Sequence, residues 1–181
     1  MPEAIGMCDA AELLLRALRE PEGLVSLGEA DWDLLLRVAR RSRLLGRIDA
    51  DLSDAGLLER IPPTAANHLR AARNVVKHRQ TLVAWELNRI LWALAQVDVP
   101  LTILKGVAYV ISGLPNARGR LFADVDLLVP LSRIEDIEQA LIDHGWLRMK
   151  LDPYDERYYR VWMHEIPPLR HRERNTEIDI H

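Results

Sequence analysis

Residues 101–130 read LTILKGVAYVISGLPNARGRLFADVDLLVP, and the last part, DVDLLVP at 124–130, is a strong β-strand pattern. Two acidic residues alternate with apolar ones and lead into branched side chains that stop at a proline. Because successive side chains of a strand point to opposite faces, Asp124 and Asp126 are expected on one face, about 6.5–7 Å apart along the chain. The apolar residues of the segment would then face a core.

The acidic pair is a candidate metal site. Two like charges side by side are unfavourable unless a cation lies between them, and carboxylate oxygens suit Mg²⁺ or Mn²⁺. The alternative is that Asp124 and Asp126 are solvated residues at the start of a strand, which is a common arrangement. The segments on either side decide how much weight the metal hypothesis carries.

Upstream of the pair, a short apolar strand at 99–104 is followed by Lys105-Gly106 and by a segment, 107–111, that can continue as a helix. A strand that turns through glycine into a helix leaves free backbone N–H groups, which favour an anion such as phosphate. The alternative is a tight turn with a lysine on the surface. Closer to the acids, Arg118 and Arg120 are expected either to neutralise them or to contact a polyphosphate.

The last segment, TEIDIH at 176–181, is a second alternating pattern. It places Glu177, Asp179 and His181 on one face of a strand. A third carboxylate on a neighbouring strand would complete a site for two metal ions, and Asp179 is the candidate for it.

These elements together resemble the uncharacterised nucleotidyltransferase family of the DNA polymerase β-like nucleotidyltransferase superfamily. The likeness rests on Lys105-Gly106, on an arginine four residues before the Asp-x-Asp strand, and on Glu-Ile-Asp-Ile-His at 177–181. It covers roughly residues 97–181 and is weaker in the part before them.

The resemblance implies an α+β fold, with an N-terminal helical subdomain (1–96) packed on a minimal nucleotidyltransferase core (97–181) that has a small mixed sheet. Its implied reaction moves a nucleoside monophosphate from an NTP, with ATP expected, to an unknown acceptor and releases pyrophosphate. The implied catalytic and metal-binding residues are Asp124, Asp126 and Asp179, with Mg²⁺ or Mn²⁺. The implied nucleotide-binding residues are Lys105, Gly106 and Arg120.

Two departures from the family pattern define the alternative. The superfamily usually has Gly-Ser or Gly-Gly after its first strand, whereas this chain has Gly106-Val107 and so lacks a hydroxyl at that point. Similar proteins also continue into further helices after the Asp-x-His strand, so the chain is expected to be truncated at its C-terminal end. The alternative is a catalytically inactive module that binds a nucleotide or a partner protein on the same fold.

Composition sets the remaining limits. The 181 residues are 49% hydrophobic and 28% charged with a net charge of −3, which fits a globular domain and gives no overall argument for nucleic acid or membrane. The single cysteine, Cys8, excludes an internal disulfide and a cysteine zinc site. No transmembrane span or signal peptide is evident, so a cytoplasmic protein is expected. The acceptor is left open between a small molecule, a protein and RNA.

Apolar periodicity predicts helices at about 10–18, 32–45, 52–59, 65–96 and 134–142, and strands at 146–150 and 158–163. In the longest helix, Trp85 and Trp92 are seven residues apart, and core packing is favoured over stacking on a base. Arginines gather at 37–47 and 70–79. Nucleic-acid binding is not favoured, because such groups usually form a solvated helix face balanced by acids.

Overall fold

The computed structural model has an α+β fold, as the sequence predicted, with a helical N-terminal part and a mixed five-stranded sheet. It describes residues 7–122, 124–149 and 166–181, together with Asp152, Tyr154, Tyr159 and Trp162.

The chain forms two compact units. The first contains the described residues of Met1–Arg79 and the segment Pro115–Leu121; the second contains Gln80–Leu114 and the described residues of Phe122–His181. Helix α4 (Pro63–Ala93) therefore contributes to both units. The division into domains at residue 96, which the sequence suggested, stays a prediction.

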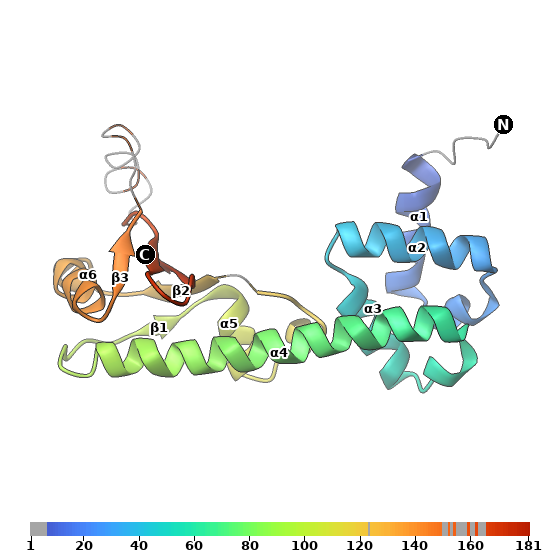
Figure 1. Cartoon of the computed structure of the whole chain (residues 1–181), viewed down its shortest axis with the longest axis horizontal. Coiled ribbons are helices and arrows are strands. Elements are labelled where there is room, and N and C mark those ends of the chain that lie inside the picture. Colours follow the sequence, from blue (N-terminus) through green and yellow to red (C-terminus); the bar gives the residue numbers. More distant parts are fainter. Residues whose placement is uncertain are drawn as a thin grey trace. The chain divides into compact units, whose positions relative to one another are not determined.

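The first unit is helical (Figure 1). Its elements are α1 (Met7–Arg19), a 3-10 turn (Pro21–Ser26), α2 (Glu29–Arg41), α3 (Leu45–Asp54), a second 3-10 turn (Leu58–Arg60) and the first part of α4. Leu35, Ile48 and Leu69, from α2, α3 and α4, are at most 1% exposed and belong to one apolar core. Burial of these apolar faces is what holds the short helices together.

The second and third helices differ from the prediction. Helix α2 ends at Arg41 rather than at 45, and α3 begins at Leu45 rather than at 52. The chain leaves α2 because Arg43 adopts a left-handed conformation with φ 58°, while the Leu44 N–H donates to the Ala39 carbonyl at 2.8 Å. These are the features of a Schellman C-cap. They were hidden from the sequence analysis because the cap residue is arginine instead of the usual glycine.

The second unit is built on the sheet, whose strand order is β1-β2-β5-β4-β3. The strands are β1 (Thr102–Ile103), β2 (Asp124–Leu128), β3 (Trp146–Arg148), β4 (Leu169–His171) and β5 (Glu177–Ile180). Strands β2 and β5 are parallel, and the other neighbouring pairs are antiparallel. The parallel pair at the centre of the order brings the two alternating segments of the sequence side by side.

Three helices cover the apolar face of the sheet: the second part of α4, α5 (Lys105–Ile111) and α6 (Ile134–Asp143) (Figure 1). Leu127 and Ile180 from the sheet are fully buried in one core with Ile90 of α4, Val107 of α5 and Leu141 of α6. The apolar side of the two central strands therefore faces the helices, which leaves the acidic side chains on the other side.

The expected strand at 158–163 lies mainly outside the described residues. Tyr159 and Trp162, which are described, have helical backbone, so the prediction is wrong for them. Strand β3 instead pairs with β4, with Trp146 opposite His171. Strand β4 was missed because three residues are too few to show a period.

Core packing of Trp85 and Trp92 was also a wrong prediction. The two indoles are 44% and 63% exposed. Trp85 lies beneath two guanidinium groups, with Arg89 Cζ 5.1 Å and Arg174 Cζ 5.5 Å from its ring centre. Cation–π contacts of this kind stabilise an aromatic ring that stays on the surface. Within the described residues, no helix is both long and apolar enough to cross a membrane.

Candidate active site

The two central strands bring the predicted acidic residues together in the second unit. In the parallel register, Asp126 lies opposite Asp179, and Asp124 lies opposite Glu177. Asp126 is only 3% exposed, whereas Asp124 is exposed and Asp179 is half-buried. Four carboxylates from β2 and β5 thus lie at adjoining positions of one sheet, among them the three predicted site residues.

Lys105 is the cation that neutralises the buried acid. Its Nζ donates to Asp126 Oδ1 at 2.5 Å. Its place at the start of α5 is fixed by the Leu104 N–H, which donates to the Asp126 carbonyl at 2.9 Å, and by a left-handed backbone at Lys105 with φ 50°. A left-handed conformation is unfavourable for a residue with a Cβ, so the chain retains a strained lysine at the acidic strand.

His181 lies beside both Asp126 and Lys105, so the three side chains form one polar group. Its Nε2 lies 3.4 Å from Asp126 Oδ1 and 3.4 Å from Lys105 Nζ. The backbone of His181 continues the parallel pairing, since its N–H donates to the Leu127 carbonyl at 2.8 Å and its carbonyl accepts from Val129 at 3.0 Å. The predicted site did not include His181, although the alternation of 177, 179 and 181 was the signal that placed it on this face.

Charge distinguishes Asp179 from the neighbouring acid on the same strand. Burial, followed by the negative charges of Asp126 and Asp124, raises the pKa of Asp179 above its ordinary value. Glu177, by contrast, forms an ion pair with Arg170 of β4, whose Nη2 lies 2.8 Å from Glu177 Oε1. Asp179 is therefore the carboxylate of β5 that feels the acidic pair most directly.

Gly106 has a packing reason to be glycine. A Cβ at this position would lie 2.7 Å from Cε1 of Phe122, closer than real contacts allow. The next side chain, Val107, is fully buried in the core. A hydroxyl at position 107 would therefore face the core instead of a nucleotide.

A family model described as uncharacterised nucleotidyltransferase matches residues 28–181. The chain belongs to this family. The match takes in the segment 97–181, on which the resemblance mainly rested, and most of the helical part before it. No curated protein and no solved structure matches the chain.

The carboxylates of the site fit a divalent cation by their chemistry. Carboxylates from β2 and β5 lie on neighbouring positions, and burial followed by the charges of Asp126 and Asp124 raises the pKa of Asp179. Hard oxygen donors of this kind suit Mg²⁺ or Mn²⁺. Among the described side chains, no group of three or more His, Cys, Asp or Glu already has the arrangement of a metal site. In the chain alone, the Lys105 ammonium supplies the positive charge at Asp126.

The two arginines before β2 belong to the first unit. Arg118 forms an ion pair with Asp54 of the same unit. Arg120 lines a pocket of the first unit together with Arg118. A role for Arg120 in holding a triphosphate stays a prediction.

Proposed function

We propose that the chain transfers a nucleoside monophosphate from an NTP, with ATP as the expected donor, to an acceptor and releases pyrophosphate. In this reaction an acceptor oxygen attacks the α-phosphorus, the bond from that phosphorus to the oxygen bridging it to the β-phosphate breaks, and the acceptor's proton is lost. Membership of the nucleotidyltransferase family supports the reaction class. The observation that carries the proposal is the register of β2 and β5. It sets Asp126 opposite Asp179, and Asp124 lies two residues before Asp126 on β2.

Asp124, Asp126 and Asp179 would hold Mg²⁺ or Mn²⁺. Such ions, when bound, stabilise charge on the phosphates and lower the pKa of the attacking hydroxyl. Asp179 is also the residue assigned to receive the acceptor's proton. Its raised pKa suits that role, because a base works best when its pKa approaches the working pH.

Lys105 is proposed to hold the triphosphate, together with the backbone of Gly106. The Lys105 side chain is 58% exposed and flexible, so its ammonium can leave Asp126 for a phosphate oxygen when a nucleotide arrives. A lysine that exchanges a carboxylate for a phosphate keeps its charge paired in both states.

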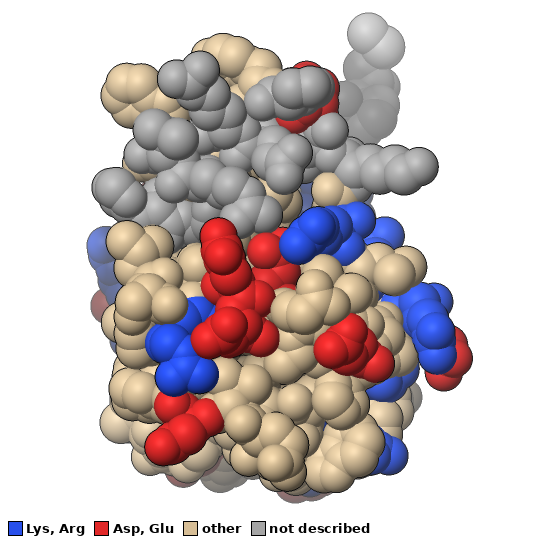
Figure 2. Space-filling model, turned by 90° about the vertical axis from the view of Figure 1, so that its left-hand side faces the viewer, with Lys and Arg blue, Asp and Glu red and all other residues tan. Residues whose placement is uncertain are grey.

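The acceptor is proposed to be a small molecule or a protein group, with RNA less favoured. Three arginines of the helical unit are paired with acids: Arg37 with Asp33, Arg47 with Asp51 and Arg73 with Asp49, each at 2.7 Å. Acidic side chains also separate the basic ones on the face shown in Figure 2. Among the described residues of that face, the basic side chains do not form the uninterrupted surface that usually marks nucleic-acid binding. The expected cytoplasmic location stays a prediction.

The test is calorimetric titration with a non-hydrolysable ATP analogue, with and without Mg²⁺. The wild-type chain is expected to bind in a Mg²⁺-dependent way, and the Asp124→Asn, Asp126→Asn double variant is expected to lose that dependence. Asp136→Asn is the matched control, because Asp136 is an exposed acid of α6 paired with Arg133. Equal Mg²⁺-dependent binding by the double variant and the control would reject the site.

A second candidate is an inactive module that binds a nucleotide or a partner protein on the same fold. Two observations favour it. The residue after Gly106 is a buried valine, so no hydroxyl is present there, and Asp126 already forms an ion pair with Lys105. Nucleotide binding without pyrophosphate release, in the presence of Mg²⁺ and a range of acceptors, would identify this function in place of transfer.

A further inference from the structure

The helical unit contains a pocket that the acidic site does not use. It has a volume of about 550 Å³ and lies between the turn that joins α2 to α3 and the segment Pro115–Leu121. Four of its lining residues are arginines: Arg43, Arg47, Arg118 and Arg120. Among the described residues that line it there is no carboxylate. All of its lining residues belong to the first unit.

The pocket wall is held by a close approach of two glycines. A Cβ on Gly46 would lie 2.5 Å from the Gly119 carbonyl oxygen and 2.6 Å from Cγ2 of Val76. Gly119 itself has φ 68°, a left-handed conformation that favours glycine. Because backbone meets backbone here, the segment Pro115–Leu121 is held against α3, which fixes the backbone positions from which the arginines on both sides of the pocket extend.

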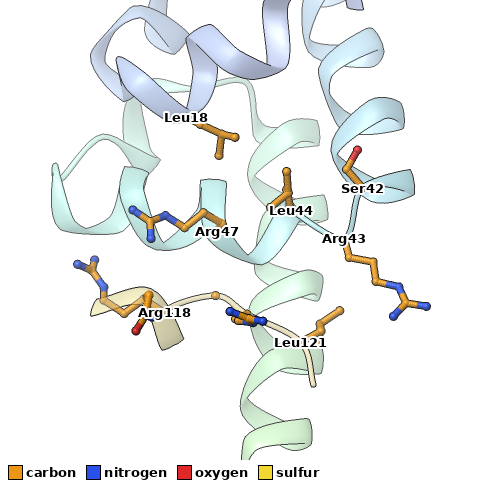
Figure 3. A pocket seen from close by; sticks show the side chains of 10 residues that line it. Leu18, Ser42, Arg43, Leu44, Arg47, Arg118 and Leu121 are labelled. Atoms are coloured by element: carbon orange, nitrogen blue, oxygen red, sulfur yellow. The ribbon is translucent and has the colours of Figure 1, made fainter. Parts of the chain in front are cut away.

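The arginines are distributed around the pocket. Figure 3 shows Arg47 and Arg118 on one side and Arg43 on the other, with Leu44 between them. Arg47 is paired with Asp51, and Arg118 is paired with Asp54. Within the described part of the chain, Arg43 has no carboxylate partner. The pocket therefore carries more positive charge than the neighbouring acids balance.

The start of α3 adds to this field. Leu44, which lines the pocket, is the N-cap of α3 and makes no side-chain cap hydrogen bond. The first N–H groups of a helix lack intrahelical partners, and the positive end of the helix dipole favours an anion. The guanidinium groups and the uncapped start of α3 thus both favour the binding of an anion in this pocket.

Arg43 is retained at a conformational cost. It occupies the left-handed cap position of α2 with φ 58°, where glycine is favoured. Arginine is less favourable than glycine at such a position because its Cβ clashes with the backbone. Sparsely populated backbone conformations concentrate at functional sites, and here the strained residue is the pocket arginine without an acidic partner.

We propose that this pocket binds the phosphate group of a small organic phosphate. The arginines and the start of α3 recognise the phosphate by charge-assisted hydrogen bonds. Leu18, Leu44 and Leu121 line the rest of the pocket and contact the organic part of the ligand. The volume lies within the range of roughly 300–1,000 Å³ that small-molecule sites occupy. This site is additional to the proposed nucleotidyl transfer, and its failure would leave that proposal untouched.

The experiment is calorimetric titration of the full chain with AMP and with inorganic phosphate, in EDTA so that no divalent metal is present. The wild-type chain and the Asp126→Asn variant are expected to bind AMP equally, and more tightly than inorganic phosphate. Arg43→Gly and Arg120→Gln are each expected to weaken AMP binding about tenfold, the typical loss of one hydrogen bond to a charged group. Arg41→Gln is the control, because Arg41 is exposed and close to Arg43 in sequence but does not line the pocket.

Arg43→Gly separates ligand binding from folding. Glycine suits φ 58°, so this variant is expected to melt no lower than the wild type while it loses affinity. Three outcomes would overturn the proposal: no AMP binding by the folded wild-type chain, equal binding by Arg43→Gly, Arg120→Gln and Arg41→Gln, or loss of AMP binding in Asp126→Asn alone. The last outcome would assign the phosphate to the acidic site of the second unit.

Discussion

Asp126 of β2 lies directly opposite Asp179 of β5 in the parallel pair at the centre of the sheet. The two acids belong to strands whose other faces are buried, so neither side chain can turn away into the core. Their repulsion is met in part by the Lys105 ammonium at 2.5 Å from Asp126. The sheet therefore holds like charges close together, which lowers the free energy of unfolding of the chain.

Asp179→Asn is expected to raise the free energy of unfolding at pH 7. The folded-state pKa of Asp179 is raised, so the native state binds a proton more tightly than the unfolded chain does. Ionisation of Asp179 therefore destabilises the fold as the pH rises from the unfolded pKa, about 3.9, to above the folded one. Urea denaturation should show a stability gain over the wild type at pH 7 that shrinks toward pH 4.

Glu177→Gln is the matched control for that measurement. It changes an acid on the same strand, but one that is paired with Arg170. No gain in stability is expected from it, because the loss of a partly exposed ion pair costs up to about 1 kcal/mol. A gain in Glu177→Gln equal to that in Asp179→Asn would contradict the local origin of the repulsion.

Lys105→Gly is expected to be more stable than Lys105→Ala by about 1 kcal/mol, because Lys105 has φ 50° and only glycine adopts this conformation without strain. Both variants remove the ammonium from Asp126, so the difference between their free energies of unfolding reports the backbone strain at position 105 alone. Urea denaturation of the two proteins measures it. Equal stability would show that the turn before α5 relaxes once the lysine is removed.

The central strands of the sheet could be predicted from the sequence, and the site around them only in part. Alternation at 124–130 and 176–181 was enough to find β2 and β5, because each strand has one apolar and one acidic face. Their parallel register is a long-range pairing, which local periodicity does not contain. The contact of Lys105 with Asp126 spans 21 residues and follows from another long-range pairing, that of β1 with β2.

Other features were hidden for local reasons. The break between α2 and α3 depends on an arginine in a cap conformation that normally indicates glycine, so the apolar pattern ran through it. The exposed Trp85 is covered by guanidinium groups, one of which, Arg174, comes from the turn after β4, whereas the exposed Trp92 meets His144 edge to face. A single helix pattern cannot distinguish an indole in the core from one covered by a distant arginine.

His171 is expected to make the stability of the chain depend on pH between about 7 and 5. Burial, and then the charge of Arg174, lowers the pKa of His171. Its Nδ1 accepts from the N–H groups of Glu173 and Arg174, each at 3.2 Å, so the folded ring is held without a proton on that nitrogen. In the unfolded chain, the ring takes up a proton near pH 6.5. Stability is therefore complete above that pH and falls as the pH drops toward the folded pKa.

The variant that checks this is His171→Asn, whose amide oxygen keeps an acceptor near Nδ1 but does not titrate. Its free energy of unfolding should be flatter than that of the wild type between pH 7 and 5. His78→Asn, at an exposed position of α4, should keep the wild-type slope. An unchanged slope in His171→Asn would assign the pH dependence to other groups.

Gly106→Ala is expected to destabilise the chain by about 1–3 kcal/mol, the usual cost of overpacking a core. Its Cβ would lie 2.7 Å from Phe122 Cε1, and Phe122 is only 8% exposed. Phe122→Leu removes that ring, so the double variant should lose less than the sum of the two single losses. Gly28→Ala is the control, because the N-cap Gly28 has φ −73° and no atom within 4 Å of its Cβ position. Thermal and urea unfolding of the wild type and the four variants measure the coupling. Additive losses would mean that Gly106 is not needed for packing against Phe122.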